Sequence, residues 1–162
     1  MWMFDYFPHE LGIPVYRKPQ VLEVGEQKLL IGHGDGLGPG DKTYKVLKKF
    51  FNSQVCQWLF ARLHPNLGIT IASRWSKKSR INNLKREEKF EGQEGEFLWV
   101  FCREMEKVTH QDYYIFGHRH LPLNLQVSVD STYINVGEWV HFKTYGVYDG
   151  MNVELKEFKP LI

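Results

Sequence analysis

The chain has 162 residues, of which 43% are hydrophobic and 15% aromatic, and its formal net charge is +2. This length and composition predict one folded domain with a sizeable core and exclude a disordered chain. The small net charge creates no overall field that would indicate a nucleic-acid partner. No uncharged apolar stretch reaches the length of about 18 residues that a membrane span needs. The two cysteines, Cys56 and Cys102, are not spaced as a CxxC pair, which favours buried thiols in a reducing compartment.

Residues 1 to about 40 carry short strand signals. Three strands are predicted, at 14–16, 20–24 and 28–31. The last two are expected to form a hairpin, and the glycine-rich segment 34–40 is expected to be a loop. The chain opens on a dense aromatic cluster with neither a polar lead-in nor the basic start of a signal peptide. Met1 therefore reads as an internal residue of a longer protein.

Residues 41 to about 108 have the apolar spacing of helices, with Asp41 as a candidate N-cap. Within this zone, residues 57–75 carry exposed-looking apolar side chains, and residues 74–89 carry seven basic residues opposed only by Glu87 and Glu88. Two interpretations stay open. The charge run alone favours a solvated helix face. The neighbouring apolar stretch favours a surface for an amphipathic lipid or an anionic membrane.

Residues 112 to 158 return to strand signals. Strands are predicted at 112–116, 123–129, 132–136, 139–148 and 152–158. Asp149 and Gly150 lie between the last two, and this residue pair is typical of a hairpin turn.

Two of the predicted strands end in glycine and histidine. GHGD at 32–35 follows the strand 28–31, and GHRH at 117–120 follows the strand 112–116. Two histidines at i and i+2 on extended chain point to the same side. Ligands of open α/β sheets gather at the carboxyl ends of strands. The sequence therefore predicts a metal site formed by His33, His118 and His120.

The other polar residues near these motifs have less specific patterns. Asp35 is read as a loop cap rather than as a ligand or an acceptor for one of the histidines. Asn135 is read as an Asx turn at the end of a strand. Four more histidines have no partner spacing and are read as ordinary residues: His9, His64, His110 and His141.

Several motifs together resemble a known superfamily. GHGD at 32–35, GHRH at 117–120 and YINVG at 133–137 resemble the last conserved blocks of the calcineurin-like metallophosphoesterases. Within that superfamily, ASRWSKKS at 72–79 resembles the UDP-2,3-diacylglucosamine pyrophosphatases of lipid A biosynthesis. The resemblance covers nearly the whole chain. It implies a single α/β domain over 1–162, a partial sandwich of mixed β-sheets with flanking helices and a helical lid insertion at about 57–89.

The resemblance also implies a chemistry. His33 and His118 would be ligands of one divalent ion and His120 of another, with Mn²⁺ as the first choice, although imidazoles suit zinc or iron equally. The implied reaction is hydrolysis of UDP-2,3-diacylglucosamine to 2,3-diacylglucosamine 1-phosphate and UMP, in the cytoplasm and at the periphery of the inner membrane. The lid residues expected to hold the sugar and phosphate of this lipid-linked nucleotide are Ser79, Asn82 and Arg86.

The sequence departs from the family pattern at its start. The family's first three blocks, DxH, GDxxD and GNHD, supply the carboxylate that bridges the two ions, and none of them occurs here. The chain thus resembles the C-terminal part of such an enzyme, and on its own it is expected to be inactive. The alternative is a catalytically silent fragment or a lipid-binding remnant of the fold. A nucleic-acid site at the basic tract ranks below both, because no nucleic-acid motif accompanies it.

Overall fold

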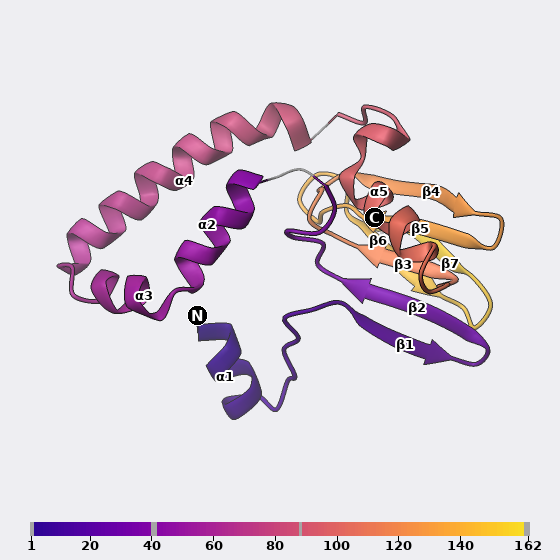
Figure 1. The fold of residues 1–162 in the computed structure, drawn as a ribbon, viewed down its shortest axis with the longest axis horizontal. Coiled ribbons are helices and arrows are strands. Elements are labelled where there is room, and N and C mark those ends of the chain that lie inside the picture. Colours follow the sequence, from indigo (N-terminus) through magenta and orange to yellow (C-terminus); the bar gives the residue numbers. More distant parts are fainter. Residues whose placement is uncertain (1, 40–41, 88, 161–162) are drawn as a thin grey trace.

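The structure is a computed structural model that describes residues 2–39, 42–87 and 89–160. Within these ranges the side chains of residues 2–3, 42–45, 48 and 78–87 lie outside the description. A β-sheet region forms one part of the molecule, and a group of long helices extends away from it (Figure 1). The described residues therefore have the mixed α/β fold, with a mixed sheet and flanking helices, that the sequence predicts.

Five strands form one mixed sheet. Their bounds are Gln20–Val24 (β1), Gln27–Gly32 (β2), Tyr113–Phe116 (β3), Pro122–Ser128 (β4) and Ser131–Val136 (β5). They lie in the order β1-β2-β3-β5-β4, and the three central strands are parallel. Gly32 pairs with Phe116, which pairs with Asn135. Because this register aligns the carboxyl ends of β2, β3 and β5, the segments that follow them meet at one edge of the sheet.

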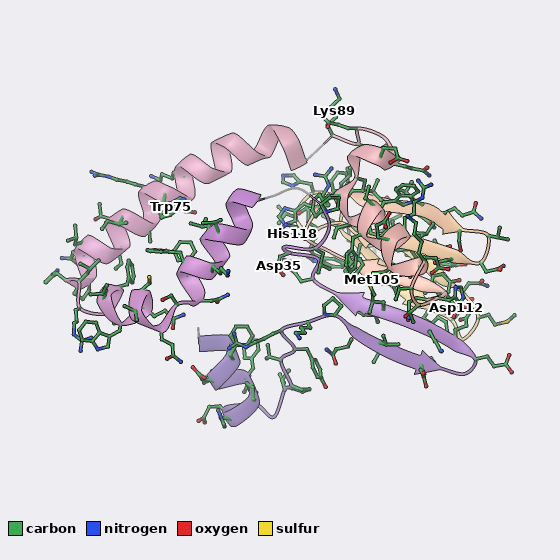
Figure 2. All side chains as sticks on the ribbon, viewed as in Figure 1. Asp35, Trp75, Lys89, Met105, Asp112 and His118 are labelled. Carbon is green, nitrogen blue, oxygen red and sulfur yellow. The ribbon has the colours of Figure 1, made fainter. Side chains whose placement is uncertain are left out.

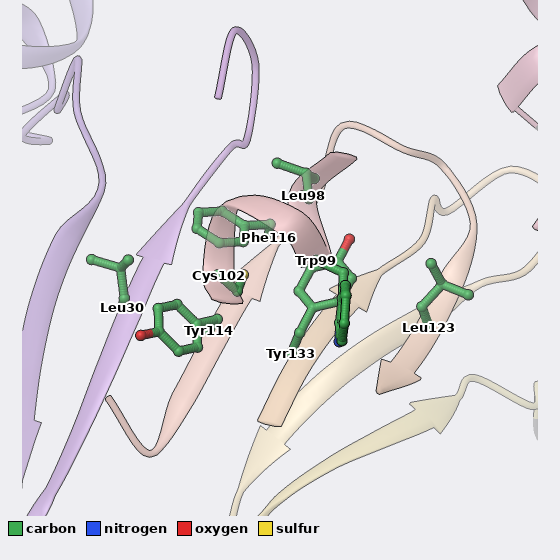
Figure 3. Packing of buried hydrophobic residues seen from close by; sticks show 8 residues of the cluster. All are labelled: Leu30, Leu98, Trp99, Cys102, Tyr114, Phe116, Leu123 and Tyr133. Atoms are coloured by element: carbon green, nitrogen blue, oxygen red, sulfur yellow. The ribbon is translucent and has the colours of Figure 1, made fainter. Parts of the chain in front are cut away.

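Helix α5 (Phe97–Glu106) covers one face of the sheet. Its buried face presents Leu98, Trp99 and Cys102 to residues that alternate along the strands, such as Leu30 and Tyr133 (Figure 3). Successive strand residues point to opposite faces, so this set contributes one side of the core. The Trp99 indole Nε1 also donates to the Gln126 carbonyl oxygen at 2.9 Å, which attaches the helix to β4.

A β-hairpin covers the other face. Strands β6 (Thr144–Tyr148) and β7 (Val153–Glu157) pair antiparallel, and in the turn between them the Asp149 carboxylate accepts hydrogen bonds from the Met151 and Asn152 amides. Val153 of β7 packs with Leu29 and Ile134, the neighbours in sequence of the residues that face α5. The sheet therefore lies between a helix and a hairpin, and the predicted turn at Asp149 is confirmed.

Three further helices form an arm beside the sheet region (Figure 1). They are α2 (Lys42–Asn52), α3 (Gln54–Phe60) and α4 (Pro65–Glu87). Ser53 caps α3, because its Oγ accepts from the Cys56 amide at 3.5 Å. Proline is favoured at the first position of a helix, where its missing N–H is not needed, and α4 begins with Pro65.

The elements differ from the sequence-based expectation in three places. Residues Trp2–Glu10 form a helix, α1, and segment 14–16 is not a strand. The helical zone predicted at 41 to about 108 is broken at residues 61–64, just before α4 begins at Pro65, and again at 89–92. The strand predicted at 139–148 begins only at Thr144, because the Glu138 carboxylate accepts hydrogen bonds from three successive backbone amides, 140–142, and makes a turn.

Glu106, the last residue of α5, joins the helix to the sheet. Its Oε2 accepts from the Tyr114 hydroxyl at 2.8 Å and from the Gln111 amide at 3.2 Å, and its Oε1 lies 2.6 Å from His110 Nδ1 and accepts from Ser128 Oγ at 3.2 Å. Burial alone would raise the pKa of Glu106, but these hydrogen bonds outweigh burial and lower it. The bond to Glu106 raises the pKa of His110.

These shifts predict a pH-dependent stability. The protonated His110 contributes below its ordinary pKa of 6.5, and this contribution is lost as the pH rises through its raised pKa in the folded chain. The Glu106 contribution is lost only as the pH falls through its lowered pKa. We expect His110→Gln to lower the free energy of unfolding at pH 5.5 by less than about 1 kcal/mol, since solvent screens this half-exposed pair, and to have no effect at about pH 9.

Urea unfolding followed by tryptophan fluorescence measures this difference. In a chain that already carries Glu106→Gln, His110→Gln should lose its pH dependence. An equal loss at both pH values in the otherwise unchanged chain would mean that the His110 ring acts through packing and not through its charge.

Candidate functional site

The two histidine motifs meet at the edge of the sheet where the parallel strands end. β2 ends at Gly32 and β3 at Phe116, and the Gly117 amide donates to the His33 carbonyl oxygen at 3.2 Å. The imidazole rings of His33 and His118 lie with their centroids 5.2 Å apart in an edge-to-face arrangement. The Gly-His pattern at both strand ends thus brings into contact the rings of two residues that are far apart in sequence.

The loop that carries the second motif has an unusual backbone. His118 and His120 have φ angles of 66° and 54°, in the left-handed region that residues other than glycine rarely enter. The Arg119 amide donates to the Gly117 carbonyl oxygen at 2.8 Å, and this hydrogen bond closes a tight turn with His118 at its centre. Such residues cost of order 1 kcal/mol or more each and cluster at functional sites, where the surroundings hold them in place.

Asn135 holds this loop from the neighbouring strand. It is completely buried at the end of β5, and its Nδ2 donates to the Gly117 carbonyl oxygen and to the Tyr133 hydroxyl. Its Oδ1 accepts from the Gly137 amide at 3.1 Å, which is the predicted Asx turn. The bond to Gly117 was not predicted, and it makes Asn135 a clamp between the ends of β3 and β5.

The start of α5 supports both histidine segments. Gly34 has a φ angle of 103°, and a Cβ added there would lie 3.0 Å from Leu98 Cδ1, so Leu98 packs directly beneath the His33 segment. The next contact is made by Phe97, whose ring lies edge-on to the His118 ring with centroids 6.2 Å apart. Sequence reasoning missed these residues, because an apolar run at the start of a helix is the ordinary pattern of a core.

The same two loops carry His120, the third predicted ligand, and Asp35, the expected loop cap. His120 is exposed and Asp35 is half-buried, and both make contacts within the fold. Asp35 and His118 lie at the end of the sheet region that is nearest the helical arm (Figure 2). Among the described residues, no group of three or more His, Cys, Asp or Glu side chains is placed to hold a metal ion. The convergence of His120 with the other two histidines stays a prediction.

This donor set fits part of a two-metal centre and not a whole one. Two divalent ions need an anionic ligand that bridges them and balances their charge. The described residues bring two imidazoles together, but they form no group of three or more side chains that could hold a metal ion. Asp112, a carboxylate near these strands, has another role, because its Oδ2 accepts from the Lys28 amide at 2.7 Å.

Three histidines outside the two motifs have partners close to them in sequence. His110 bonds to Glu106, His141 lies 3.3 Å from the Glu138 carboxylate, and His64 Nδ1 accepts from the Asn66 amide at 3.4 Å. These contacts agree with their interpretation as ordinary residues.

The helical arm exposes an unusual amount of apolar surface. Its exposed apolar side chains come from all three helices and the turns between them: Val46, Phe50, Phe51, Val55, Trp58, Leu59, Phe60, Leu63, Leu67, Ile69, Ile71 and Trp75. The centroids of the Phe51 and Trp75 rings lie 5.4 Å apart, and this contact connects α2 to α4. Figure 2 labels Trp75 on α4. The predicted substrate residues Ser79, Asn82 and Arg86 belong to α4, but their side chains lie outside the described residues.

The exposure of the arm agrees with the apolar pattern read at 57–75. Charge accompanies the apolar groups, since the Arg62 guanidinium lies 3.3 Å from the centre of the Trp58 ring. Among the described residues, no helix combines the length and the apolar character needed to cross a bilayer.

Comparison with known proteins gives several relatives of one kind. The chain is 27% identical over 173 aligned positions to a UDP-2,3-diacylglucosamine hydrolase of Porphyromonas gingivalis, and the match covers 99% of this chain and 66% of that protein. A Shewanella halifaxensis protein of the same name is 30% identical over 110 positions, which cover 68% of this chain and 44% of that protein. A third, from Proteus mirabilis, is 25% identical over 124 positions, covering 76% and 50%.

The chain thus spans between 44% and 66% of the length of these relatives. No family model matches the chain.

Proposed function

Because this chain is similar, over 99% of its length, to a UDP-2,3-diacylglucosamine hydrolase, we propose that it serves the metal-dependent hydrolysis of UDP-2,3-diacylglucosamine to 2,3-diacylglucosamine 1-phosphate and UMP. The observation that carries this proposal is the pair formed by His33 and His118, whose rings lie 5.2 Å apart where two parallel strands end. Catalytic and binding groups of α/β sheets collect at this edge. The reaction belongs to lipid A biosynthesis, and the chain would act as a hydrolase.

Within this proposal, His33 and His118 bind one divalent ion, and His120 binds a second, with Mn²⁺ as the first choice. Bound ions of this kind supply charge that stabilises a phosphoryl group and lowers the pKa of a water molecule. Asn135 keeps the His118 loop in place through the Gly117 carbonyl oxygen. The carboxylates that would complete the centre are those of the DxH, GDxxD and GNHD blocks. The fold would then be the metallophosphoesterase sandwich, with residues 1–162 as part of a single domain.

The lid, at about residues 57–89, would comprise the end of α3 and the whole of α4 in the helical arm. Its exposed apolar side chains would receive the acyl chains, and burial contributes about 0.8 kcal/mol per CH₂ group. Ser79, Asn82 and Arg86, farther along α4, would hold the sugar and the phosphate. An arm that carries aromatic rings beside cations such as Arg62 and Arg74 also suits peripheral contact with the cytoplasmic face of the inner membrane.

The lid proposal is tested in an extended protein, in which this chain follows a segment that carries the DxH, GDxxD and GNHD blocks. We expect the triple change Trp58→Ser, Leu59→Ser and Phe60→Ser to raise KM for long-acyl UDP-2,3-diacylglucosamine at least about tenfold, because these exposed side chains each lose apolar contact with the lipid. Hydrolysis of a small soluble phosphodiester should be unaffected. Steady-state kinetics on both substrates measure the difference.

A control replaces three apolar residues outside the arm that are still more exposed, Val108, Val129 and Met151, by serine. These changes should alter neither substrate's kinetics. Equal losses on the lipid and on the small phosphodiester in the arm variant would show that residues 58–60 serve the fold, and the lipid proposal would lose its support.

A catalytically silent, lipid-binding protein is the second candidate. It is favoured by one observation, the lack of a three-ligand metal group among the described residues. Such a protein would bind vesicles of anionic phospholipid through the arm and would release no UMP from the substrate, even in its extended form.

A further inference from the structure

Arg119 lies between the two histidines of the GHRH motif and forms a buried ion pair. Its Nε donates to Glu96 Oε2 at 2.8 Å, and one of its terminal nitrogens donates to the Lys89 carbonyl oxygen at 3.2 Å. The Arg119 side chain is 12% exposed and that of Glu96 is 1% exposed. A single guanidinium thus joins the histidine loop to two points on the segment between α4 and α5.

This pair is poorly arranged if its purpose is stability alone. Burying two charges costs several kcal/mol per ion, and well-packed apolar residues of similar size often serve stability equally well. The other carboxylate oxygen, Glu96 Oε1, is buried and finds no hydrogen-bond partner among the described residues. Glu96 also precedes the first turn of α5 without capping it. The pair does fix the orientation of the Arg119 side chain, because the planar guanidinium holds its N–H donors in a rigid geometry.

We propose that Arg119 and Glu96 are positioning residues that set the orientation of His118. The two residues beside Arg119 have left-handed backbone angles, so the loop needs an external restraint to stay in this conformation. Glu96 is followed directly by Phe97, whose ring contacts the His118 ring. Fixing Arg119 on Glu96 therefore fixes the distance between the His118 and Phe97 rings.

The same guanidinium links the loop to the root of the helical arm. Lys89 lies just beyond α4 (Figure 2), and its carbonyl oxygen is the second acceptor of Arg119. A shift at the arm root would thus pull on the residue between the two histidines. This inference rests on the proposed function for its catalytic meaning. Its test, however, reads the geometry of the loop in the chain alone, without ion or substrate.

The experiment compares nuclear magnetic resonance spectra of the chain and of Arg119→Gln. Ring currents from Phe97 and His33 displace the imidazole proton signals of His118, because both rings lie edge-on to it. Arg119→Gln removes the positive charge and leaves Phe97 and His33 unsubstituted. We expect the His118 signals to move toward those of an exposed histidine. Amide hydrogen exchange should become about 10- to 100-fold faster at residues 117–120 and 89–92, but not in the β6–β7 hairpin.

Arg103 of α5 provides the matched control, since it forms an exposed ion pair with Glu94 at 3.1 Å. Arg103→Gln should leave the His118 signals in place. Arg119→Lys keeps a charge opposite Glu96 and should restore most of the displacement. If Arg119→Gln does not fold, Glu96→Gln is expected to shift the same signals. Unchanged His118 signals in a folded variant of lowered melting temperature would overturn the inference and leave the pair a purely structural contact.

Discussion

His118→Ala in the extended protein is expected to lower kcat/KM for UDP-2,3-diacylglucosamine by at least about 100-fold. Mutation of a residue that only hydrogen-bonds to a metal ligand lowers metal affinity or activity about 10- to 100-fold, so loss of a ligand itself should lower the activity at least as much. His118 is the histidine whose ring contacts the rings of both His33 and Phe97. Release of UMP in the presence of Mn²⁺ measures the rate.

The control for this change is His64→Ala, which replaces a histidine of the arm whose Nδ1 accepts a hydrogen bond from the Asn66 amide. It should leave the rate unchanged. The chain without the three blocks should turn over no faster than the His118→Ala variant. Fast hydrolysis by the chain alone that disappears with His118→Ala would mean that a residue of this chain, such as Asp35, supplies the missing carboxylate.

Leu98→Ala is expected to lower the free energy of unfolding by about 2 to 5 kcal/mol. Leu98 has no exposed surface, and it packs under Gly34 on one side and in the core cluster of the sheet on the other. The change removes buried carbon atoms and leaves a cavity that a rigid glycine turn and a packed sheet cannot easily close. Urea unfolding followed by fluorescence gives the magnitude.

Val108→Ala is the matched control, because this side chain is 81% exposed near the end of the same helix. Its effect should stay within about 0.5 kcal/mol. A loss below about 1 kcal/mol for Leu98→Ala would mean that the histidine segment relaxes into the space, and that the site is not held rigidly by α5.

Much of the sheet region could be predicted from local patterns. The β1–β2 hairpin follows from two apolar runs separated by Gly25, which adopts a φ angle of 63° in the turn. The meeting of His33 and His118 follows from glycine and histidine at the ends of two strands, once these strands pair in parallel. In both cases neighbouring residues carry the signal.

Other features depend on contacts between distant residues, which no local pattern contains. The aromatic start of the chain has strand propensity, yet it forms α1, where the Arg17 guanidinium lies 3.7 Å from the centre of the Phe4 ring. The Arg119–Glu96 pair joins residues 23 positions apart in sequence. Periodicity does not relate the two, so the structure was needed to find this contact. The position of His120 depends on left-handed backbone angles at His118 and at His120 itself, which residues other than glycine rarely adopt and which the sequence therefore does not predict.

Anomalous X-ray scattering from crystals of the extended protein grown with Mn²⁺ tests the proposed centre most directly. We expect one manganese peak about 2 Å from ring nitrogens of His33 and His118, and a second peak at the same distance from a ring nitrogen of His120, because metal–imidazole bonds have this length. Manganese peaks bound only by other residues, with the His33 and His118 rings in contact with each other and with no ion, would contradict the account.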